Sequence, residues 1–80
     1  MRRGKVRKKM KWFKEVFLPS FATGKELQIS EKQFRIFERY LKGTKEDGYI
    51  YKVFGTVDEI KIEAVDWACV GKHRYYVTIN

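Results

Sequence analysis

The chain has few of the residues that organise disulfide-rich or metal-dependent proteins. Its 80 residues include one cysteine, one histidine and one proline. The lone Cys69 excludes an internal disulfide, so the chain is not a disulfide-stapled scaffold and a reducing, cytoplasmic setting is expected. Structural zinc takes four protein ligands, and Cys69 with His73 would supply two. We therefore expect no metal site and no cofactor.

Long apolar runs are also missing. A secretory signal needs about 7–15 apolar residues after its basic start, and a membrane span needs about 20. Lys11, Lys14 and Glu15 interrupt every such run near the N-terminus. The sequence therefore predicts neither a signal peptide nor a membrane-spanning helix.

Acidic residues are absent from one end of the chain. The first fourteen residues carry eight cations and no acid, whereas from Glu15 onward ten bases balance the ten acids. The formal charge of +8 is therefore concentrated at the N-terminus. This asymmetry indicates a polyanionic partner without identifying it.

The basic segment has the apolar spacing of a helix. Four apolar side chains recur at helical intervals while lysines and arginines fill the other faces: Val6, Met10, Phe13 and Phe17. The spacing predicts a helix over 6–17, after a flexible basic arm over 1–5. We expect Leu18-Pro19 to end the helix, because proline lacks an N–H and disfavours helical geometry in the residue before it.

A second helix is predicted over 30–42, after a connection at 20–28 that has room for one helical turn. Ser30 and Gln33 make an S-x-x-Q capping box at its start. Gly43 is a fitting C-terminal stop.

Beyond Lys45 the apolar period changes to two, which is typical of strands. The predicted strands and turns are a strand over 49–54, a turn region Gly55–Glu59, a strand over 60–70, a Gly71-Lys72 turn and a strand over 74–79. In the longest strand, Ile60 and Ile62 have the opposite parity to Val65 and Trp67. A β-bulge near Ala64 would bring both pairs to one face.

These elements predict an α+β fold in which two N-terminal helices precede a three-stranded antiparallel β-meander (ααβββ). We expect a single domain over 1–80, with a helical part over 6–42 and the antiparallel sheet over 48–80. Either Tyr49–Phe54 or Arg74–Ile79 would then be an exposed edge strand that could support a homodimer by sheet extension.

A winged-helix-like fold is the alternative. A short helix from Thr23, a turn at Gln28–Ile29 and a recognition helix from Ser30 would be followed by the terminal hairpin as a wing. The acids Glu31 and Glu38 on the second helix argue against its lying on DNA.

The strongest catalytic pattern is Asp47 followed by Glu59-Ile60-Lys61. It resembles the D…(D/E)-x-K pattern of restriction-endonuclease-like nucleases, in which two carboxylates hold a divalent metal and a lysine positions the attacking water. The competing interpretation is that Lys61 and Glu63 are the solvent side of an amphipathic strand. We favour that interpretation and expect no catalytic residues and no enzyme.

Twelve residues are candidates for nucleic-acid binding. The N-terminal cations would contact phosphates, Trp12 and Tyr76 would stack on bases, and cations near Tyr76 would border it. These candidates are Arg2, Arg3, Lys5, Arg7, Lys8, Lys9, Lys11, Trp12, Lys14, Lys72, Arg74 and Tyr76.

The sequence favours a small, non-enzymatic protein that binds DNA or RNA through its basic N-terminal helix with low sequence specificity. The alternative is a small inhibitor or regulator, of the kind that phages and mobile elements encode, whose basic arm occupies the nucleic-acid channel or acidic groove of a larger enzyme. A winged-helix DNA-binding regulator is third. Binding to an anionic membrane surface is less favoured, because the apolar stripe of the first helix is needed to cover the sheet.

Overall fold

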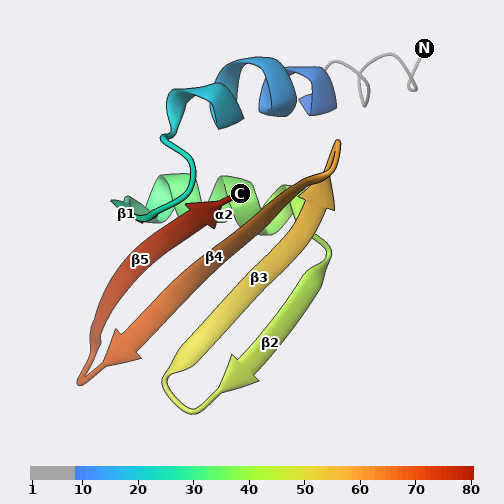
Figure 1. The fold of residues 1–80 in the computed structure, drawn as a ribbon. Coiled ribbons are helices and arrows are strands. Elements are labelled where there is room, and N and C mark those ends of the chain that lie inside the picture. The colour runs from blue at the N-terminus through green and yellow to red at the C-terminus, as the bar shows by residue number, and fades with distance from the viewer. Residues whose placement is uncertain (1–8) are drawn as a thin grey trace.

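The computed structural model describes residues 9–80, which form a five-stranded antiparallel sheet with helices on one side (Figure 1). The strands are β1 (Glu26–Ile29), β2 (Gly43–Asp47), β3 (Ile50–Val57), β4 (Ile60–Cys69) and β5 (Lys72–Ile79). Their order across the sheet is β1-β5-β4-β3-β2. The expected ααβββ fold with three strands is therefore wrong, and the sheet is not confined to 48–80.

Two short strands account for the difference. β1 pairs with β5 where a connection was expected, and β2 pairs with β3 where the composition indicates a loop. β1, ELQI, alternates polar and apolar residues over only four positions, and β2, GTKED, has no large apolar side chain, so the period-two signal is short in β1 and missing from β2. Both pair in antiparallel register with backbone N–H and C=O groups of β5 and β3 that the meander alone would leave to solvent.

The new outer strands change the predicted edges. Tyr49–Phe54 and Arg74–Ile79 were each expected to be an edge, but β3 lies between β4 and β2, and β5 lies between β4 and β1. The edges are therefore the short β1 and the charged β2, and short or charged edges resist edge-to-edge pairing.

The first helical segment runs over residues 9–20 and changes its winding along the way. An α-helical turn over 9–12 leads into the π-helix η1 (Phe13–Phe17) and then the 3₁₀ turn η2 (Leu18–Ser20). The prediction that Leu18-Pro19 ends the helix is wrong by one turn. Pro19 occupies the start of η2, where a missing N–H costs no hydrogen bond. The predicted arm over 1–5 lies outside the described residues.

The second helix, α2 (Glu31–Tyr40), confirms the predicted capping box. Gln33 N–H donates to Ser30 Oγ over 3.1 Å, and Ser30 N–H donates to Gln33 Oε1 over 2.9 Å. The helix ends at Tyr40, with Leu41 as its C-cap, and Gly43 begins β2 instead of stopping the helix. The winged-helix alternative is wrong, because strand β1 occupies the place of its first helix.

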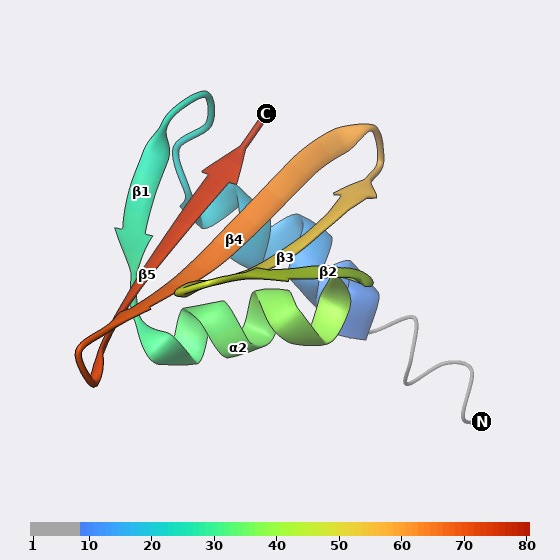
Figure 2. The ribbon, with the colours of Figure 1, turned by 90° about the horizontal axis from the view of Figure 1, so that it is seen from below.

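Both helices cover the same face of the sheet and enclose the core (Figure 2). Phe13 and Phe17 from η1 and Phe34 and Phe37 from α2 are buried against strand residues that include Val77. Phe13 and Phe17 stack with ring centroids 5.6 Å apart, and Phe13 meets Phe37 edge-on at 6.0 Å. No element within residues 9–80 covers the other face.

Candidate nucleic-acid interface

The uncovered side of the sheet, here called the open face, is set by the strand register. Residues paired directly across antiparallel strands lie on the same face, so the register fixes every member. The open face comprises Glu26 and Gln28 of β1, Lys72, Arg74, Tyr76 and Thr78 of β5, Lys61, Glu63, Val65, Trp67 and Cys69 of β4, Ile50, Lys52, Phe54 and Thr56 of β3, and Gly43, Lys45 and Asp47 of β2.

The open face carries large apolar side chains. Trp67 is 50% exposed, Phe54 is 40% exposed and Ile50 is 36% exposed. Val65 of β4 and Tyr76 of β5 are paired directly across the two strands on the same face, and both are half-buried. Solvent-facing strand positions are usually polar, so a cluster of this kind indicates a binding surface.

The same cluster explains the parity change in the sequence of β4. The predicted bulge near Ala64 is wrong, because the β3–β4 register continues without interruption from Val57↔Ile60 to Ile50↔Trp67. Ile62 and Ala64 point into the core, whereas Val65 and Trp67 point to the open face. The parity change therefore marks apolar side chains on the uncovered side of the sheet.

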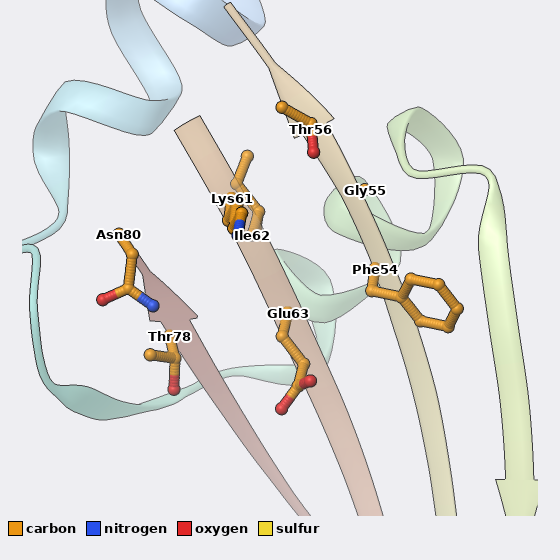
Figure 3. A pocket seen from close by; sticks show the side chains of 8 residues that line it. All are labelled: Phe54, Gly55, Thr56, Lys61, Ile62, Glu63, Thr78 and Asn80. Carbon is orange, nitrogen blue, oxygen red and sulfur yellow. The ribbon is translucent and has the colours of Figure 1, made fainter. Parts of the chain in front are cut away.

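Phe54 extends the apolar cluster to the edge strand. Its ring turns toward β2, as Figure 3 shows, and covers Gly43, the residue opposite it. A Cβ on Gly43 would lie 2.4 Å from Phe54 Cε1, so only a residue without a side chain fits under the ring. The glycine lets the ring lie flat against the sheet beside the start of β2.

Three shallow depressions follow one another along the open face. The first, of about 360 Å³, is lined by Phe54, Thr56, Lys61, Glu63, Thr78 and Asn80 with the neighbouring backbone (Figure 3). The second depression, of about 350 Å³, is lined by Val65 and Tyr76 and shares Glu63 with the first. The second meets the third, of about 440 Å³, at Trp67. Together they make a track from Lys61 to Lys72.

Cations border this track. Lys52 is paired directly with Lys45 across β3 and β2, and Arg74 with Trp67 across β5 and β4. Like charges directly opposite each other are unfavourable. Lys52 is relieved in part by Glu63, whose Oε2 lies 3.3 Å from Lys52 Nζ. Cations outnumber acids on the open face: Lys45, Lys52, Lys61, Lys72 and Arg74 against Glu26, Asp47 and Glu63.

The basic helix lies on the covered side of the sheet. Lys9 and Lys11 are exposed, and Lys14 Nζ lies 3.3 Å from the carboxylate of Asp58 in the β3–β4 turn. Trp12 is 41% exposed and stacks on Phe17 with ring centroids 5.3 Å apart. Trp12 and Tyr76, the two predicted stacking residues, are therefore separated by the sheet.

The start of that helix nevertheless meets the open face at the edge of the sheet. Tyr40 Oη donates to the Lys9 carbonyl over 3.2 Å, which joins residue 9 to the end of α2. A depression of about 550 Å³ there is lined by both Met10 and Phe54. It shares Phe54 and Thr56 with the first depression of the open face. The track therefore continues around the edge to the cationic helix.

A polar pair of one buried and one exposed side chain lies at the opposite end of the covered face. Asp66 is 7% exposed, and its Oδ1 lies 2.9 Å from His73 Nδ1. Burial raises the pKa of Tyr75, and the negative charge of Asp66 raises it further. Burial also raises the pKa of Tyr51, with a further contribution from the Glu38 carboxylate. Asp66, His73, Tyr51 and Tyr75 are therefore the polar side chains at this end of the core.

Neither the nuclease-like pattern nor the Cys69–His73 pair comes together in the fold. Asp47 is paired with Ile50 at one end of β3, and Glu59 lies in the turn beyond the other end, so the length of β3, roughly 23 Å at about 3.3 Å per residue, separates them. Cys69 lies on the open face, whereas His73 lies on the covered face beside Asp66. Within residues 9–80 no group of three or more histidine, cysteine or acidic side chains could hold a metal ion.

The structure brings three predicted residues together and shows four that sequence reasoning missed. Lys72, Arg74 and Tyr76 share the open face. The missed residues are Trp67, Phe54, Lys52 and Lys61. The parity change in β4 was the available signal for Trp67, whereas Phe54 and Lys52 of β3 had no comparable signal. The remaining candidates Arg2, Arg3, Lys5, Arg7 and Lys8 lie outside the described residues.

Comparisons with protein-family models, curated proteins and solved structures give no significant match. Across the part of the chain that the structure describes, no helix has the length and apolar character needed to cross a bilayer.

Proposed function

We propose that this protein binds DNA or RNA through the cations of its N-terminal segment, without catalysis and with low sequence specificity. The observation that carries the proposal is the location of the charge. Eight cations stand in the first fourteen residues, and the remaining bases and acids balance. Lysine and arginine that neutralise phosphates release counterions, and this release drives binding of any sequence.

The packing of the first helix is compatible with this role. Phe13 and Phe17 are buried against the core, so the apolar stripe is already used and the polar side is left to a partner. Lys9 and Lys11 are exposed on that side. A helix that bound a membrane would need its apolar stripe for the lipid.

The test is a titration of fluorescein-labelled single-stranded and duplex oligonucleotides at several salt concentrations, followed by anisotropy. A double variant, Lys9→Gln with Lys11→Gln, removes two exposed cations and leaves the core untouched. It should weaken binding to all sequences alike. The matched control is Lys25→Gln with Lys32→Gln, which removes two exposed lysines elsewhere and should leave binding nearly unchanged.

The second candidate function is binding to an acidic groove of a larger protein. The exposed Trp67, Phe54 and Ile50 favour it, because aromatic clusters are enriched in protein interfaces. Capture of a partner from nuclease-treated lysate, together with no binding to oligonucleotides, would favour this candidate over the first.

A further inference from the structure

We propose that the open face binds the unpaired bases of single-stranded nucleic acid, with Trp67 as the principal stacking residue. The inference rests on the proposed function and specifies the form of the polyanion. It assigns to the sheet a task different from that of the basic helix: the helix contacts phosphates, and the open face contacts bases.

The chemistry of the open face fits an unpaired strand better than a duplex. Trp67 and Tyr76 present flat rings, and Arg74 and Lys52 stand in the neighbouring strands. A single strand offers flat bases and phosphates together, whereas a duplex keeps the faces of its bases stacked inside. Stacking on aromatic side chains tolerates every base, which agrees with the low specificity expected of the protein.

The width of the sheet also argues against a duplex. Five strands about 4.8 Å apart place β1 and β2 roughly 19 Å from each other. The major groove of DNA is about 12 Å wide and admits a helix or a two-stranded ribbon. The open face is therefore too wide to enter the major groove of an undeformed duplex, whose stacked bases offer no exposed ring faces to Trp67 and Tyr76.

Charge favours a single-stranded nucleic acid over a second copy of this chain as the partner of the open face. Two open faces stacked on each other would bring Lys45, Lys52 and Lys61 of one copy toward the same surplus of cations on the other. A polyanion neutralises these lysines, including the unfavourable direct pair Lys45↔Lys52. The surplus of positive charge therefore selects an anionic partner for this apolar surface.

The track has the length to hold several nucleotides. From Lys61 to Cys69, β4 extends roughly 26 Å at about 3.3 Å per residue. Trp67 lines two of the depressions and is 50% exposed. At the other end, the depression shared by Phe54 and Met10 leads to the cationic helix. One single-stranded nucleic acid can thus contact both the open face and the cationic helix by passing around the β2 edge of the sheet.

The experiment compares four fluorescein-labelled probes of about 12 nucleotides, within the range of about 4–16 that single-strand-binding modules cover. They are oligo-dT, oligo-U, a duplex, and an abasic deoxyribose-phosphate chain that keeps the phosphates and lacks the bases. Oligo-dT and oligo-U should bind about 5- to 160-fold more tightly than the abasic chain, by the usual stacking contribution of an aromatic side chain.

Variants then locate the effect. Trp67→Ala should remove most of this preference for bases and leave binding to the abasic chain unchanged. Trp67→Leu keeps an apolar side chain on the sheet without a stacking ring and should behave like Trp67→Ala. Tyr49→Ala is the matched control, because Tyr49 is 71% exposed but lies in the β2–β3 turn. It should retain the preference.

A fluorescence measurement reports on Trp67 directly. Trp12→Phe leaves Trp67 as the single tryptophan of the chain. Its emission should be quenched by oligo-dT and not by the abasic chain. Quenching by both probes, or by neither, would contradict base stacking at this position.

Other outcomes separate the two proposals. If the abasic chain and the duplex bind as tightly as oligo-dT, and the Trp67 variants match the parent, the inference is overturned and the proposed function stands. If no probe binds, the proposed function fails together with it. If Trp67→Leu instead converts a dimer to a monomer in sedimentation and leaves oligonucleotide binding unchanged, the open face joins two copies and the inference is overturned.

Discussion

Asp66 and His73 form a buried-to-exposed pair at one end of the sheet, with Asp66 Oδ1 2.9 Å from His73 Nδ1. Asp66 is 7% exposed, whereas half of the His73 side chain is exposed. A buried carboxylate is costly unless it is hydrogen-bonded. The imidazole therefore satisfies a polar group that points toward the covered side of the sheet.

His73→Ala should lower the free energy of unfolding by about 1–3 kcal/mol, because it leaves the Asp66 carboxylate without this partner. The measurement is a urea titration followed by circular dichroism. Lys72→Ala is the control, since Lys72 is exposed and adjacent, and it should change the free energy by less than about 0.5 kcal/mol. Equal effects of the two variants would contradict the assigned role of His73.

The capping box of α2 gives a second stability prediction. Ser30→Ala removes the acceptor of the Gln33 N–H and should lower the free energy of unfolding by about 0.5–2 kcal/mol. Ser30→Asp retains an acceptor and should stay close to the parent. The measurement is the urea midpoint of unfolding. Equal midpoints for Ser30→Ala and Ser30→Asp would contradict the contribution of the cap.

Stability should fall in alkaline solution because of two tyrosines. Burial, with nearby carboxylates, raises the pKa values of Tyr51 and Tyr75 above their ordinary value of 10.0. Above that value the unfolded chain loses these protons first, so the folded state binds more protons and the free energy of unfolding decreases as pH rises. The decrease continues through the raised pKa values of the folded state.

Tyr51→Phe or Tyr75→Phe should each reduce this alkaline loss when urea midpoints are compared at neutral pH and above pH 10. Tyr49→Phe is the control, because Tyr49 is exposed and its replacement should leave the pH dependence unchanged. A steeper alkaline loss in Tyr51→Phe than in the parent would show that the sign is wrong.

Val70 gives a prediction of increased stability. It has φ of +52° in the β4–β5 turn, a conformation that β-branched residues rarely adopt, and it is 92% exposed. Val70→Asn should raise the free energy of unfolding by about 1 kcal/mol, because asparagine accepts this conformation in a two-residue hairpin turn.

The opposite change is available at the next residue. Gly71 has φ of +76°, and an added Cβ would meet no atom within 4 Å, so Gly71→Ala tests backbone conformation alone. It should lower the free energy of unfolding by about 1–2 kcal/mol. Thermal or urea midpoints that move in the same direction for Val70→Asn and Gly71→Ala would contradict the assigned turn geometry.

The sequence predicted the elements that have strong local signals. The capping box set the start of α2, and the period of two beyond Lys45 located β3, β4 and β5. β1 was not predicted, because its four residues pair with β5, which is distant in sequence. β2 is joined to its partner β3 by a two-residue turn, but GTKED has no large apolar side chain that would give an alternating pattern. The first helical segment continues through Leu18–Ser20 as the 3₁₀ turn η2. The only local signal for this turn is Pro19, the residue that was expected to end the helix.

The candidate site was predicted in part for a similar reason. Sequence reasoning assumed that apolar residues of one strand share one face, and therefore proposed a bulge that would bury Trp67. The register shows that β4 has apolar residues on both faces, with Ile62 in the core and Trp67 on the open face. Only the placement of the two helices determines which face is covered.

The most direct test of the central claim is the salt dependence of oligonucleotide binding for the parent and for a variant in which all eight cations of the first fourteen residues are replaced by glutamine. If six of them contact phosphates, the slope of log K against log salt should be about −4 on a single strand and about −5 on a duplex. The variant should lose most of this slope and most of its affinity. A variant that binds with the slope and affinity of the parent would contradict the claim that the N-terminal cations hold a polyanion.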